Sequence, residues 1–211
     1  MNLMGIAGLV IAYVVGSFPS AYLAGRMLKR IDLRKVGSGN LGTTNVYREL
    51  GLVPALIVLA CDSAKGALPT ALLPGLLGLG IASQSAAEWW AIGLGAAAIA
   101  GHAKPIFLLW RGGGKGVATA AGAFLVLTPI PALAAIVTFV VVIVGTRYAS
   151  LASLVAAYAL PAIQWAEARV SPAFYASVGI AVFVTWSHRS NIGRLRAGTE
   201  PRIGRPAGGA V

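Results

Sequence analysis

Long apolar runs dominate this chain and limit what it can fold into. They measure about 15 to 28 residues, the length of a helix that crosses a bilayer, and strands of about ten alternating residues, typical of membrane barrels, are absent from the sequence. Hydrophobic residues make up 57% of the 211 residues and charged residues 11%, far from the balance of a soluble domain. We therefore predict an all-α, polytopic transmembrane helical bundle that forms a single domain over residues 1–211.

The apolar runs also predict the number of helices. Six are visible, over about residues 3–24, 53–80, 89–110, 117–145, 149–165 and 173–186. The fourth contains Thr128-Pro-Ile-Pro131, and paired prolines remove backbone donors and oppose a continuous helix. We expect this run to break at Pro129 to Pro131 into two short or re-entrant helices of about a dozen residues each. The bundle then has seven helices.

The distribution of Lys and Arg predicts the orientation. No Lys or Arg precedes the first run, whereas Arg26, Lys29, Arg30, Arg34 and Lys35 follow it. With seven helices, all of the 17 Lys and Arg except Lys65 and Arg169 lie at one face of the membrane. The positive-inside rule then places the N-terminus outside, the C-terminus inside, and residues 194–211 in a basic cytoplasmic tail. We predict a multi-pass protein of the bacterial cytoplasmic (inner) membrane.

Two glycine-framed basic loops interrupt the apolar sequence: Gly37-Ser-Gly-Asn-Leu-Gly-Thr-Thr-Asn-Val-Tyr-Arg48 and Arg111-Gly-Gly-Gly-Lys-Gly116. Glycines let backbone N–H groups converge on an anion, hydroxyls and amides add donors, and Arg or Lys supplies charge. Such loops can hold phosphate at the surface of a bilayer. The sequence therefore suggests phospholipid chemistry.

The basic residues have two explanations. Topology and attraction to anionic headgroups account for most of the C-terminal charges, Arg194, Arg196, Arg202 and Arg205. A site for an anionic substrate fits four others better, because each is embedded among Gly, Ser, Thr or Asn: Arg48, Arg111, Lys115 and Arg147.

Several familiar chemistries do not fit the spacing. Leu109 occupies the first glycine position of a Walker loop, and Gly116 follows Lys115 where that loop has Ser or Thr. Neither His102 nor His188 begins the His-x4-Asp pattern of other glycerolipid acyltransferases. No carboxylate or His cluster has metal-ligand spacing, so we expect neither metal nor cofactor, and no basic soluble surface predicts nucleic-acid binding.

Two polar features lie within the apolar runs. Asp62 and Lys65 are three residues apart on one helical face, which predicts a buried ion pair; a role supporting the glycine loops is the alternative. Ser17, Pro19 and Ser20 lie near the end of the first run, where a bend could help to shape the site. We predict no direct contact between those three residues and substrate.

Five motifs in order resemble the acyl-phosphate-dependent glycerol-3-phosphate 1-acyltransferase family of bacterial membranes. They are Gly37-Ser-Gly-Asn-Leu-Gly-Thr-Thr-Asn45; Asp62-x-x-Lys-Gly66; Gly101-His-x-x-Pro-x-Phe107 with Gly113-Gly-Lys-Gly-Val-Ala-Thr119; Arg147-Tyr-x-Ser-Leu151; and His188-Arg-x-Asn-Ile192 with Gly198-Thr-Glu200. The resemblance covers nearly the whole chain. Thr43 stands where the family more usually has Ala, and Gly112 is one glycine more than the tightest form of the second loop.

The resemblance implies an activity and its partners. A fatty acyl group would pass from acyl-phosphate to the 1-hydroxyl of sn-glycerol 3-phosphate, giving lysophosphatidic acid and phosphate in the first step of bacterial phospholipid synthesis. Acyl-phosphate is already activated, so direct transfer without an acyl-enzyme suffices. The expected partners are the two substrates, membrane lipid and a soluble enzyme that produces acyl-phosphate. We expect a monomer with its active site on the cytoplasmic face.

The same resemblance implies the site residues. The expected catalytic residues are Lys115, Arg48, His188 and Asn191. The expected substrate-binding residues are Ser38, Gly39, Asn40, Gly42, Thr44, Asn45, Gly113, Gly114, Arg147 and Ser150. The first loop would hold the acyl-phosphate headgroup, Lys115 would reach glycerol 3-phosphate or the leaving phosphate, and the Arg147 and His188 segments would complete the polyol phosphate site. Either His188 or a substrate phosphate serves as the base.

Two other classes of function remain open from the sequence. A transporter for a phosphorylated anion would carry an inverted repeat, and the two halves of this chain show no such correspondence. The second class is a lipid enzyme that uses acyl-carrier protein or coenzyme A as the acyl donor. Sequence alone does not distinguish such an enzyme from one that uses acyl-phosphate.

Overall fold

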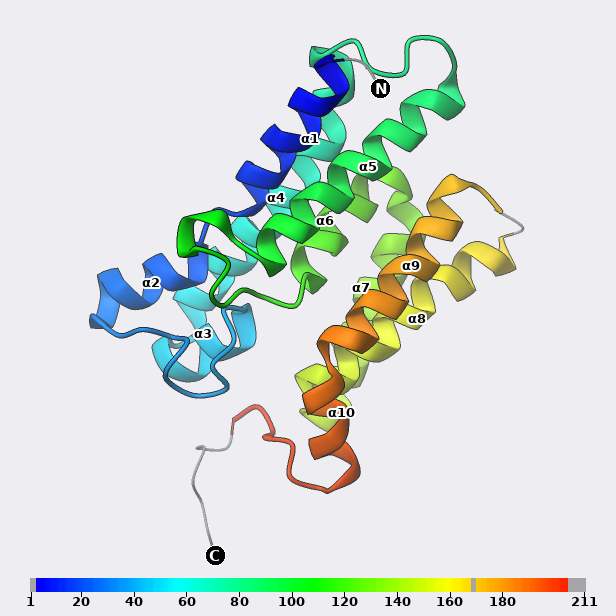
Figure 1. Cartoon of the computed structure of the whole chain (residues 1–211). Coiled ribbons are helices and arrows are strands. Elements are labelled where there is room, and N and C mark those ends of the chain that lie inside the picture. The colour runs from blue at the N-terminus through cyan, green and yellow to red at the C-terminus, as the bar shows by residue number, and fades with distance from the viewer. Residues whose placement is uncertain (1–2, 168–169, 205–211) are drawn as a thin grey trace, which may run out of the picture. The chain divides into compact units, whose positions relative to one another are not determined.

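The computed structural model describes residues 3–167 and 170–204, and every regular element in this part of the chain is a helix (Figure 1). Arg169, Arg205 and the last residues of the predicted tail lie outside the described residues. Among those described, five helical segments are long and apolar enough to cross a membrane: Leu3–Lys29, Leu52–Leu76, Gln84–Leu108, Pro129–Thr146 and Ala149–Ala166. Val117–Leu127 and Pro172–Ser187 are shorter apolar helices. The prediction of an all-α transmembrane fold is confirmed, while the seven-helix count and the orientation stay predictions.

The chain divides into two compact units, Met1–Pro129 and Ile130–Val211. The first contains α1 (Leu3–Gly16), α2 (Ser20–Lys29), α3 (Thr43–Leu50), α4 (Leu52–Leu76), α5 (Gln84–Ala103), the 3-10 turn η1 (Ile106–Leu108) and α6 (Val117–Leu127). Helix α4 packs against α6 and α5, and α1 packs against α5 (Figure 1). The prediction of a single domain stays a prediction.

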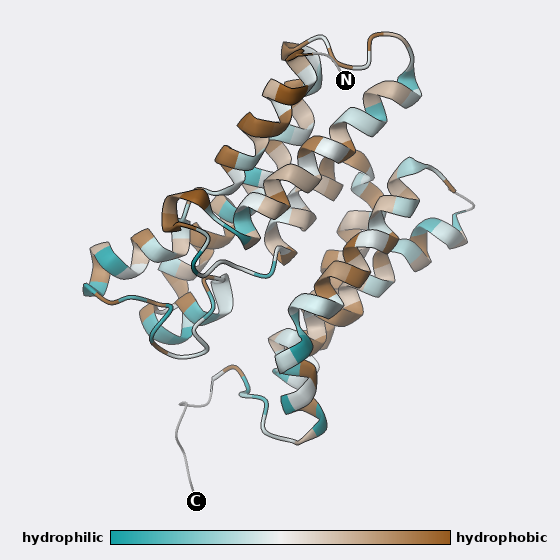
Figure 2. Ribbon diagram, viewed as in Figure 1, coloured by the Kyte–Doolittle hydropathy of each residue, from teal (hydrophilic) through white to brown (hydrophobic). Residues whose placement is uncertain are grey.

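Small residues allow the helices of the first unit to pack at backbone distance. A Cβ atom at Gly66 of α4 would overlap the carbonyl of Thr119 on α6, and one at Gly122 of α6 would overlap the carbonyl of Ser63. Glycine at such crossings is the usual way for membrane helices to approach closely. In Figure 2 the hydrophilic residues of this unit concentrate on α2, α3 and the loops around them, at one end of the bundle.

The first apolar run is not one helix. Helix α1 ends at Gly16 and α2 begins at Ser20, so the bend considered at Ser17, Pro19 and Ser20 is present. Proline at position 19 cannot donate the backbone hydrogen bond that a continuous helix needs. Within the bend, the carbonyl of Phe18 accepts a hydrogen bond from Lys65 Nζ at 2.9 Å. The bend is therefore fixed by a side chain of α4.

The fourth run breaks as predicted, but its second half is longer than expected. Helix α6 ends at Leu127 after 11 residues, and α7 (Pro129–Thr146) has 18. The expectation of two helices of about a dozen residues is wrong for α7. The reason is that Pro129 and Pro131 lie in the first turn of α7, where backbone N–H groups have no intrahelical partner to lose.

The second unit contains α7 from Ile130 onward, α8 (Ala149–Ala166), α9 (Pro172–Ser187) and α10 (Arg189–Arg196). Helices α8 and α9 pack together, and α10 contacts both. Between them, Ser177 Oγ donates to Gln164 Oε1 at 2.8 Å, and both residues are buried. Part of the predicted basic tail is thus helical, because α10 extends to Arg196.

Candidate active site

The first glycine-framed loop is shorter than the sequence predicted. It ends at Gly42, because α3 begins at Thr43 and therefore carries Thr44, Asn45 and Arg48. This helix forms where it can bury Val46 in an apolar cluster with Leu33 and Leu41. The expectation of a loop through Arg48 is corrected accordingly.

Asn45 shapes this loop from within. It is 1% exposed; its Oδ1 accepts from the Ser38 N–H at 3.0 Å, and its Nδ2 donates to the carbonyls of Leu33 and Val36 at 3.1 and 3.2 Å. A Cβ atom at Gly37, whose φ is +57°, would overlap Asn45 Oδ1. The Asn45 amide is therefore engaged in holding the loop around it.

Several hydrogen-bonding groups in and beside the first loop are available to an anionic ligand or to a hydroxyl group on such a ligand. Helix α3 has Gly42 as its N-cap and no side-chain cap, so its first backbone N–H groups and its dipole favour a bound anion. Within the described residues, the buried atoms Asn40 Oδ1 and Thr43 Oγ1 have no hydrogen-bond partner. Ser38 and Gly39 are exposed.

The second loop touches the first. Leu41 donates its backbone N–H to the carbonyl of Gly113 at 3.3 Å, and Gly114 donates its N–H to the carbonyl of His102 at 3.1 Å. A Cβ atom at Gly113 would overlap the carbonyl of Ala103, and one at Gly114 would overlap the imidazole of His102. Glycine is thus required at both positions, and Lys115 follows immediately, just before α6 begins.

Arg34 joins the two loops at the extra glycine. Its Nη1 donates to the carbonyl of Arg111 at 3.0 Å, and a Cβ atom at Gly112, whose φ is +84°, would lie 2.7 Å from its Cδ. Its Nη2 and Nε donate to the buried Asp32 carboxylate at 2.7 and 3.0 Å, and its guanidinium lies 5.1 Å from the centre of the Tyr22 ring. Hydrogen bonding to Arg34, against the opposing effect of burial, lowers the pKa of Asp32 to about 2.

The Asp32–Arg34 contact was not predicted from the sequence. The signal was available as an acidic and a basic residue two apart, directly before the first glycine loop. Their partner Arg111 lies 77 positions from Arg34, however, so no local pattern indicates what the pair connects.

A buried polar network lies beneath the second loop, and it contains the predicted ion pair. Lys65 Nζ lies 2.8 Å from Asp62 Oδ1, with side-chain exposures of 7% and 1%. Ser20 Oγ donates to the same oxygen at 2.5 Å, and His102 Nδ1 lies 3.8 Å from it. The ion pair is confirmed, and the alternative also receives support, since His102 packs directly against Gly114.

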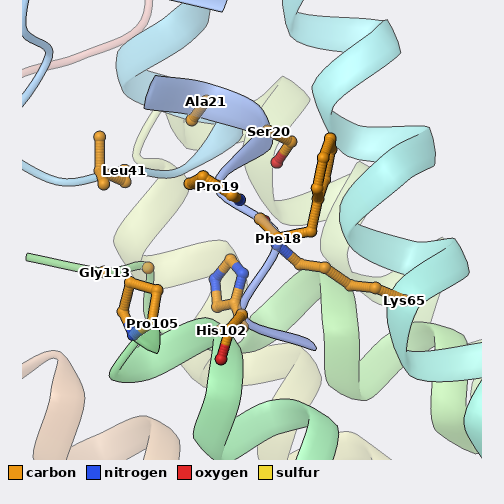
Figure 3. Close-up of a pocket in the computed structure, with 11 residues that line it drawn as sticks. Phe18, Pro19, Ser20, Ala21, Leu41, Lys65, His102, Pro105 and Gly113 are labelled. Atoms are coloured by element: carbon orange, nitrogen blue, oxygen red, sulfur yellow. The ribbon is translucent and has the colours of Figure 1, made fainter. Parts of the chain in front are cut away.

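A small pocket opens between this network and the loops (Figure 3). It is lined by residues 17–21 of the bend and by Leu41, Lys65, His102, Pro105, Gly113 and Gly114. In Figure 3 the His102 ring points toward Phe18 and Pro19, with Gly113 and Pro105 beside it. The bend, whose residues the sequence analysis placed outside substrate contact, thus forms one wall of a pocket beside the second loop.

The second unit has a separate polar cluster around Glu200. The Oε1 atom of this buried carboxylate accepts from Ser150 Oγ at 2.7 Å and from Asn191 Nδ2 at 2.6 Å, and its Oε2 accepts from Arg194 Nε at 2.7 Å. Burial alone would raise the pKa of Glu200, but these three donors outweigh it and the pKa lies below its usual value. Glu200 thus gathers two of the predicted site residues, Ser150 and Asn191.

His188 has a defined tautomer in this unit. Its Nδ1 lies 2.8 Å from the carbonyl of Val184, which can only accept, so Nδ1 carries a hydrogen. The lone pair of the neutral ring is then on Nε2, as a general base needs. His188 itself is 3% exposed.

The predicted site residues therefore fall into two sets. The first unit holds Ser38, Gly39, Asn40, Gly42, Thr44, Asn45, Arg48, Gly113, Gly114 and Lys115, and the second holds Arg147, Ser150, His188 and Asn191. Each set is gathered within its own unit, and their union in one site stays a prediction. No group of three His, Cys, Asp or Glu residues in the described ranges could hold a metal ion.

The family to which this sequence belongs indicates the class of reaction that the protein catalyses. A family model described as glycerol-3-phosphate acyltransferase matches residues 6–198, most of the chain. The chain belongs to the glycerol-3-phosphate acyltransferase family. It is accordingly an integral membrane acyltransferase of phospholipid synthesis.

Relatives agree with this assignment over nearly their full lengths. The glycerol-3-phosphate acyltransferase of Synechococcus sp. (strain CC9902) is 46% identical over 204 residues, which cover 97% of this chain and 98% of the relative. That of Desulforamulus reducens is 42% identical and covers 92% of each.

Solved structures give the same result. The crystal structure of PlsY (YgiH), an integral membrane glycerol 3-phosphate acyltransferase in its glycerol 3-phosphate form, matches with a TM-score of 0.84 and 33% identity. The match covers 95% of this acyltransferase and 96% of PlsY. The lysophosphatidic acid form of PlsY matches with a TM-score of 0.80 and 32% identity.

Proposed function

We propose that this acyltransferase moves a fatty acyl group from acyl-phosphate to the 1-hydroxyl of sn-glycerol 3-phosphate, yielding lysophosphatidic acid and inorganic phosphate. The observation that carries the proposal is the junction of two glycine-rich loops, in which Leu41 donates its N–H to the Gly113 carbonyl. Both substrates bear phosphate, and two adjoining anion-binding loops suit such a pair. The glycerol 3-phosphate and lysophosphatidic acid forms of PlsY support the acceptor and the product.

The first loop is assigned to the phosphate of the acyl donor. The uncapped start of α3 at Gly42 and Thr44 offers backbone donors, and the exposed Ser38 offers its hydroxyl. Gly39 supports the shape of the loop, because its N–H donates to the Val36 carbonyl at 3.0 Å. Arg48 adds charge, and Asn40 lies in the same loop with its Oδ1 unpartnered among the described residues. Asn45 acts by holding the loop in shape.

The remaining residues are assigned to the acceptor and to the leaving group. Lys115, held beside Gly113 and Gly114, balances charge on the departing phosphate or on glycerol 3-phosphate. Arg147, Ser150 and Asn191 bind the polyol phosphate. The hydroxyl oxygen attacks the acyl carbon, the bond from that carbon to the phosphate oxygen breaks, and inorganic phosphate leaves.

The hydroxyl proton passes to a base during this attack. The two candidates are Nε2 of His188, which the Nδ1 contact with Val184 leaves with the lone pair, and an oxygen of a substrate phosphate. Turnover of a His188→Ala variant separates them. Near-normal kcat would eliminate His188 as the base, whereas a loss of about 100-fold or more would support it.

We also propose the cellular setting. The enzyme spans the bacterial cytoplasmic membrane as a monomer, with its N-terminus outside and its active site on the cytoplasmic face. Support comes from the basic residues of α2, α3 and α10, which the positive-inside rule assigns to the cytoplasmic side. A soluble enzyme that makes acyl-phosphate would supply the donor.

A donor comparison tests the function. Purified enzyme in proteoliposomes receives glycerol 3-phosphate with acyl-phosphate, acyl-coenzyme A or acyl-carrier protein, and lysophosphatidic acid is measured. We expect product from acyl-phosphate; product from the thioesters alone would contradict the proposal.

A matched pair of lysine variants tests the assignment of the second loop. Lys115→Met should lower kcat/KM by about 100-fold or more, since it removes a charge held at the developing phosphate. Lys104→Met removes the same charge at the exposed end of α5 and should stay within about two-fold of the unmodified enzyme. Equal effects of the two changes would contradict the role of Lys115.

A further inference from the structure

Arg147 occupies a backbone conformation that suits glycine. It follows the last residue of α7 with φ at +62°, and its N–H donates to the carbonyl of Ile143 at 2.8 Å. This left-handed ending of a helix usually employs Gly or Asn, because a Cβ atom strains it. Arg147 shares this conformation with three other described non-Gly residues, Arg30, Leu109 and Trp110, so the contacts around the turn carry the argument for its role. Its side chain is exposed, and among the described residues its guanidinium has no ion-pair partner.

A segment near the C-terminus holds this turn. We name residues 200–203 the C-terminal strap. Ile203 donates its N–H to the carbonyl of Arg147 at 2.8 Å, and the guanidinium of Arg202 lies 4.9 Å from the centre of the Tyr148 ring. Glu200 fixes the other end through its hydrogen bonds to Ser150 and Asn191.

The strap lies beyond the part of the chain that the family model matches, which ends at residue 198. Within the turn itself, Thr146 Oγ1 accepts from the Tyr148 N–H at 3.2 Å, a local bond that the strap supplements. The strap residues Ile203 and Arg202 lie more than 50 positions after the residues that they contact. Those residues are Arg147 and Tyr148, which are successive in the turn.

We propose that the C-terminal strap positions Arg147 for binding a phosphate monoester. The hydrogen bond from Ile203 and the stacking of Arg202 on Tyr148 hold the left-handed turn. The backbone that carries the exposed Arg147 guanidinium is therefore held in place before substrate arrives. Pre-fixing a side chain lowers the entropy lost on binding. The inference rests on the proposed function, in which Arg147 binds the phosphate of glycerol 3-phosphate.

A pair of substitutions at one position tests the strap in the full-length enzyme. Ile203→Pro removes the N–H that Arg147 accepts, whereas Ile203→Ala keeps it and removes only side-chain atoms. Losing one hydrogen bond of this kind corresponds to about a five-fold change in an equilibrium. We expect KM for glycerol 3-phosphate to be about five-fold higher in the proline variant than in the alanine variant, with a smaller change in kcat. Equal KM values would overturn the proposal.

A second pair tests the stacking contact. Arg202→Gln removes the cation over Tyr148, and Arg196→Gln removes the same charge from the exposed end of α10. The first should raise KM for glycerol 3-phosphate more than the second. If both raise it equally, general charge attraction explains the effect and the positioning role fails.

A double-variant cycle separates the strap from the proposed function. If Arg147→Gln alone leaves KM for glycerol 3-phosphate unchanged, the assignment of Arg147 to the phosphate fails. If Arg147→Gln raises KM, Ile203→Pro should add nothing to it, since the strap acts through that guanidinium; additive effects would overturn the proposal.

Hydrogen exchange gives a readout that needs no activity. The Tyr148 amide should exchange faster in Ile203→Pro than in Ile203→Ala, because the turn opens more often without its distant hydrogen bond. Identical exchange in the two variants would show that the strap does not hold the turn.

Discussion

Neutralising Asp62 should destabilise the protein more than neutralising Asp62 and Lys65 together. In the unmodified chain the two charges lie 2.8 Å apart with almost no exposure. Asp62→Asn leaves the ammonium of Lys65 buried without a carboxylate partner. The Phe18 carbonyl still accepts a hydrogen bond from it. Lys65→Met leaves the carboxylate with the hydroxyl of Ser20. The double variant leaves no buried charge of this pair.

The magnitude follows from the burial. Removing one partner of a buried ion pair costs about 3 to 5 kcal/mol, because the other charge stays desolvated. For a protein of this size each kcal/mol lowers Tm by about 2 to 4 °C, so each single variant should lose roughly 6 to 20 °C. Replacing both charged residues by neutral ones of similar volume is nearer to neutral, so the double variant should regain more than half of that loss.

Thermal unfolding followed by tryptophan fluorescence in detergent measures these changes. Lys104→Met serves as the control, because it removes a lysine charge that is exposed at the end of α5. A Tm of Asp62→Asn within about 2 °C of the unmodified protein would refute the reasoning. So would a double variant whose loss equals the sum of the two single losses, because independent sites add.

Three further predictions concern the loops and the Glu200 cluster. Gly114→Ala should lower kcat/KM by about 10- to 100-fold, because the added Cβ overlaps His102 and shifts the loop. Combining it with His102→Ala should restore part of the activity. If activity does not recover, overlap with His102 is not the reason for the loss. Asp32 has a pKa lowered from 3.8 to about 2, so its bond to Arg34 stabilises the fold above pH 3.8, and that contribution is lost as the pH falls toward 2. Asp32→Asn should remove this part of the pH dependence of unfolding. An unchanged pH profile of the free energy of unfolding would contradict this prediction. Glu200 also has a lowered pKa, so its contribution is present above its usual value of 4.5 and is lost at lower pH; Glu200→Gln should lower Tm at pH 7 and flatten the acid limb, which thermal scans across pH can check.

The sequence predicted where helices lie better than where they bend. Proline illustrates the difficulty: Pro69 and Pro161 lie inside α4 and α8, whereas Pro19 follows the end of α1 and Pro105 follows the end of α5. All lie within or beside apolar runs, so hydropathy does not separate them. What differs is the tertiary contact at each position, such as the hydrogen bond that Lys65 donates to the Phe18 carbonyl beside Pro19, and that partner is distant in sequence.

The candidate site shows the same division. Glycine spacing located both loops, and the three-residue spacing of Asp62 and Lys65 predicted their ion pair, since both are local properties. The contacts that fix the loops were not predictable, because Arg34 reaches Arg111 and Glu200 reaches Ser150 across 77 and 50 positions. Sequence therefore predicted the groups proposed to bind phosphate, and the structure added the side chains that hold them.

The stoichiometry of a single reaction mixture tests the central claim most directly. Enzyme in proteoliposomes is given acyl-phosphate and glycerol 3-phosphate, and inorganic phosphate and lysophosphatidic acid are followed together. Direct acyl transfer predicts that the two products appear in equal amounts at all times, and that omission of glycerol 3-phosphate abolishes enzyme-dependent release of phosphate. Lysophosphatidic acid formed without phosphate release, or phosphate released without an acceptor, would contradict the account.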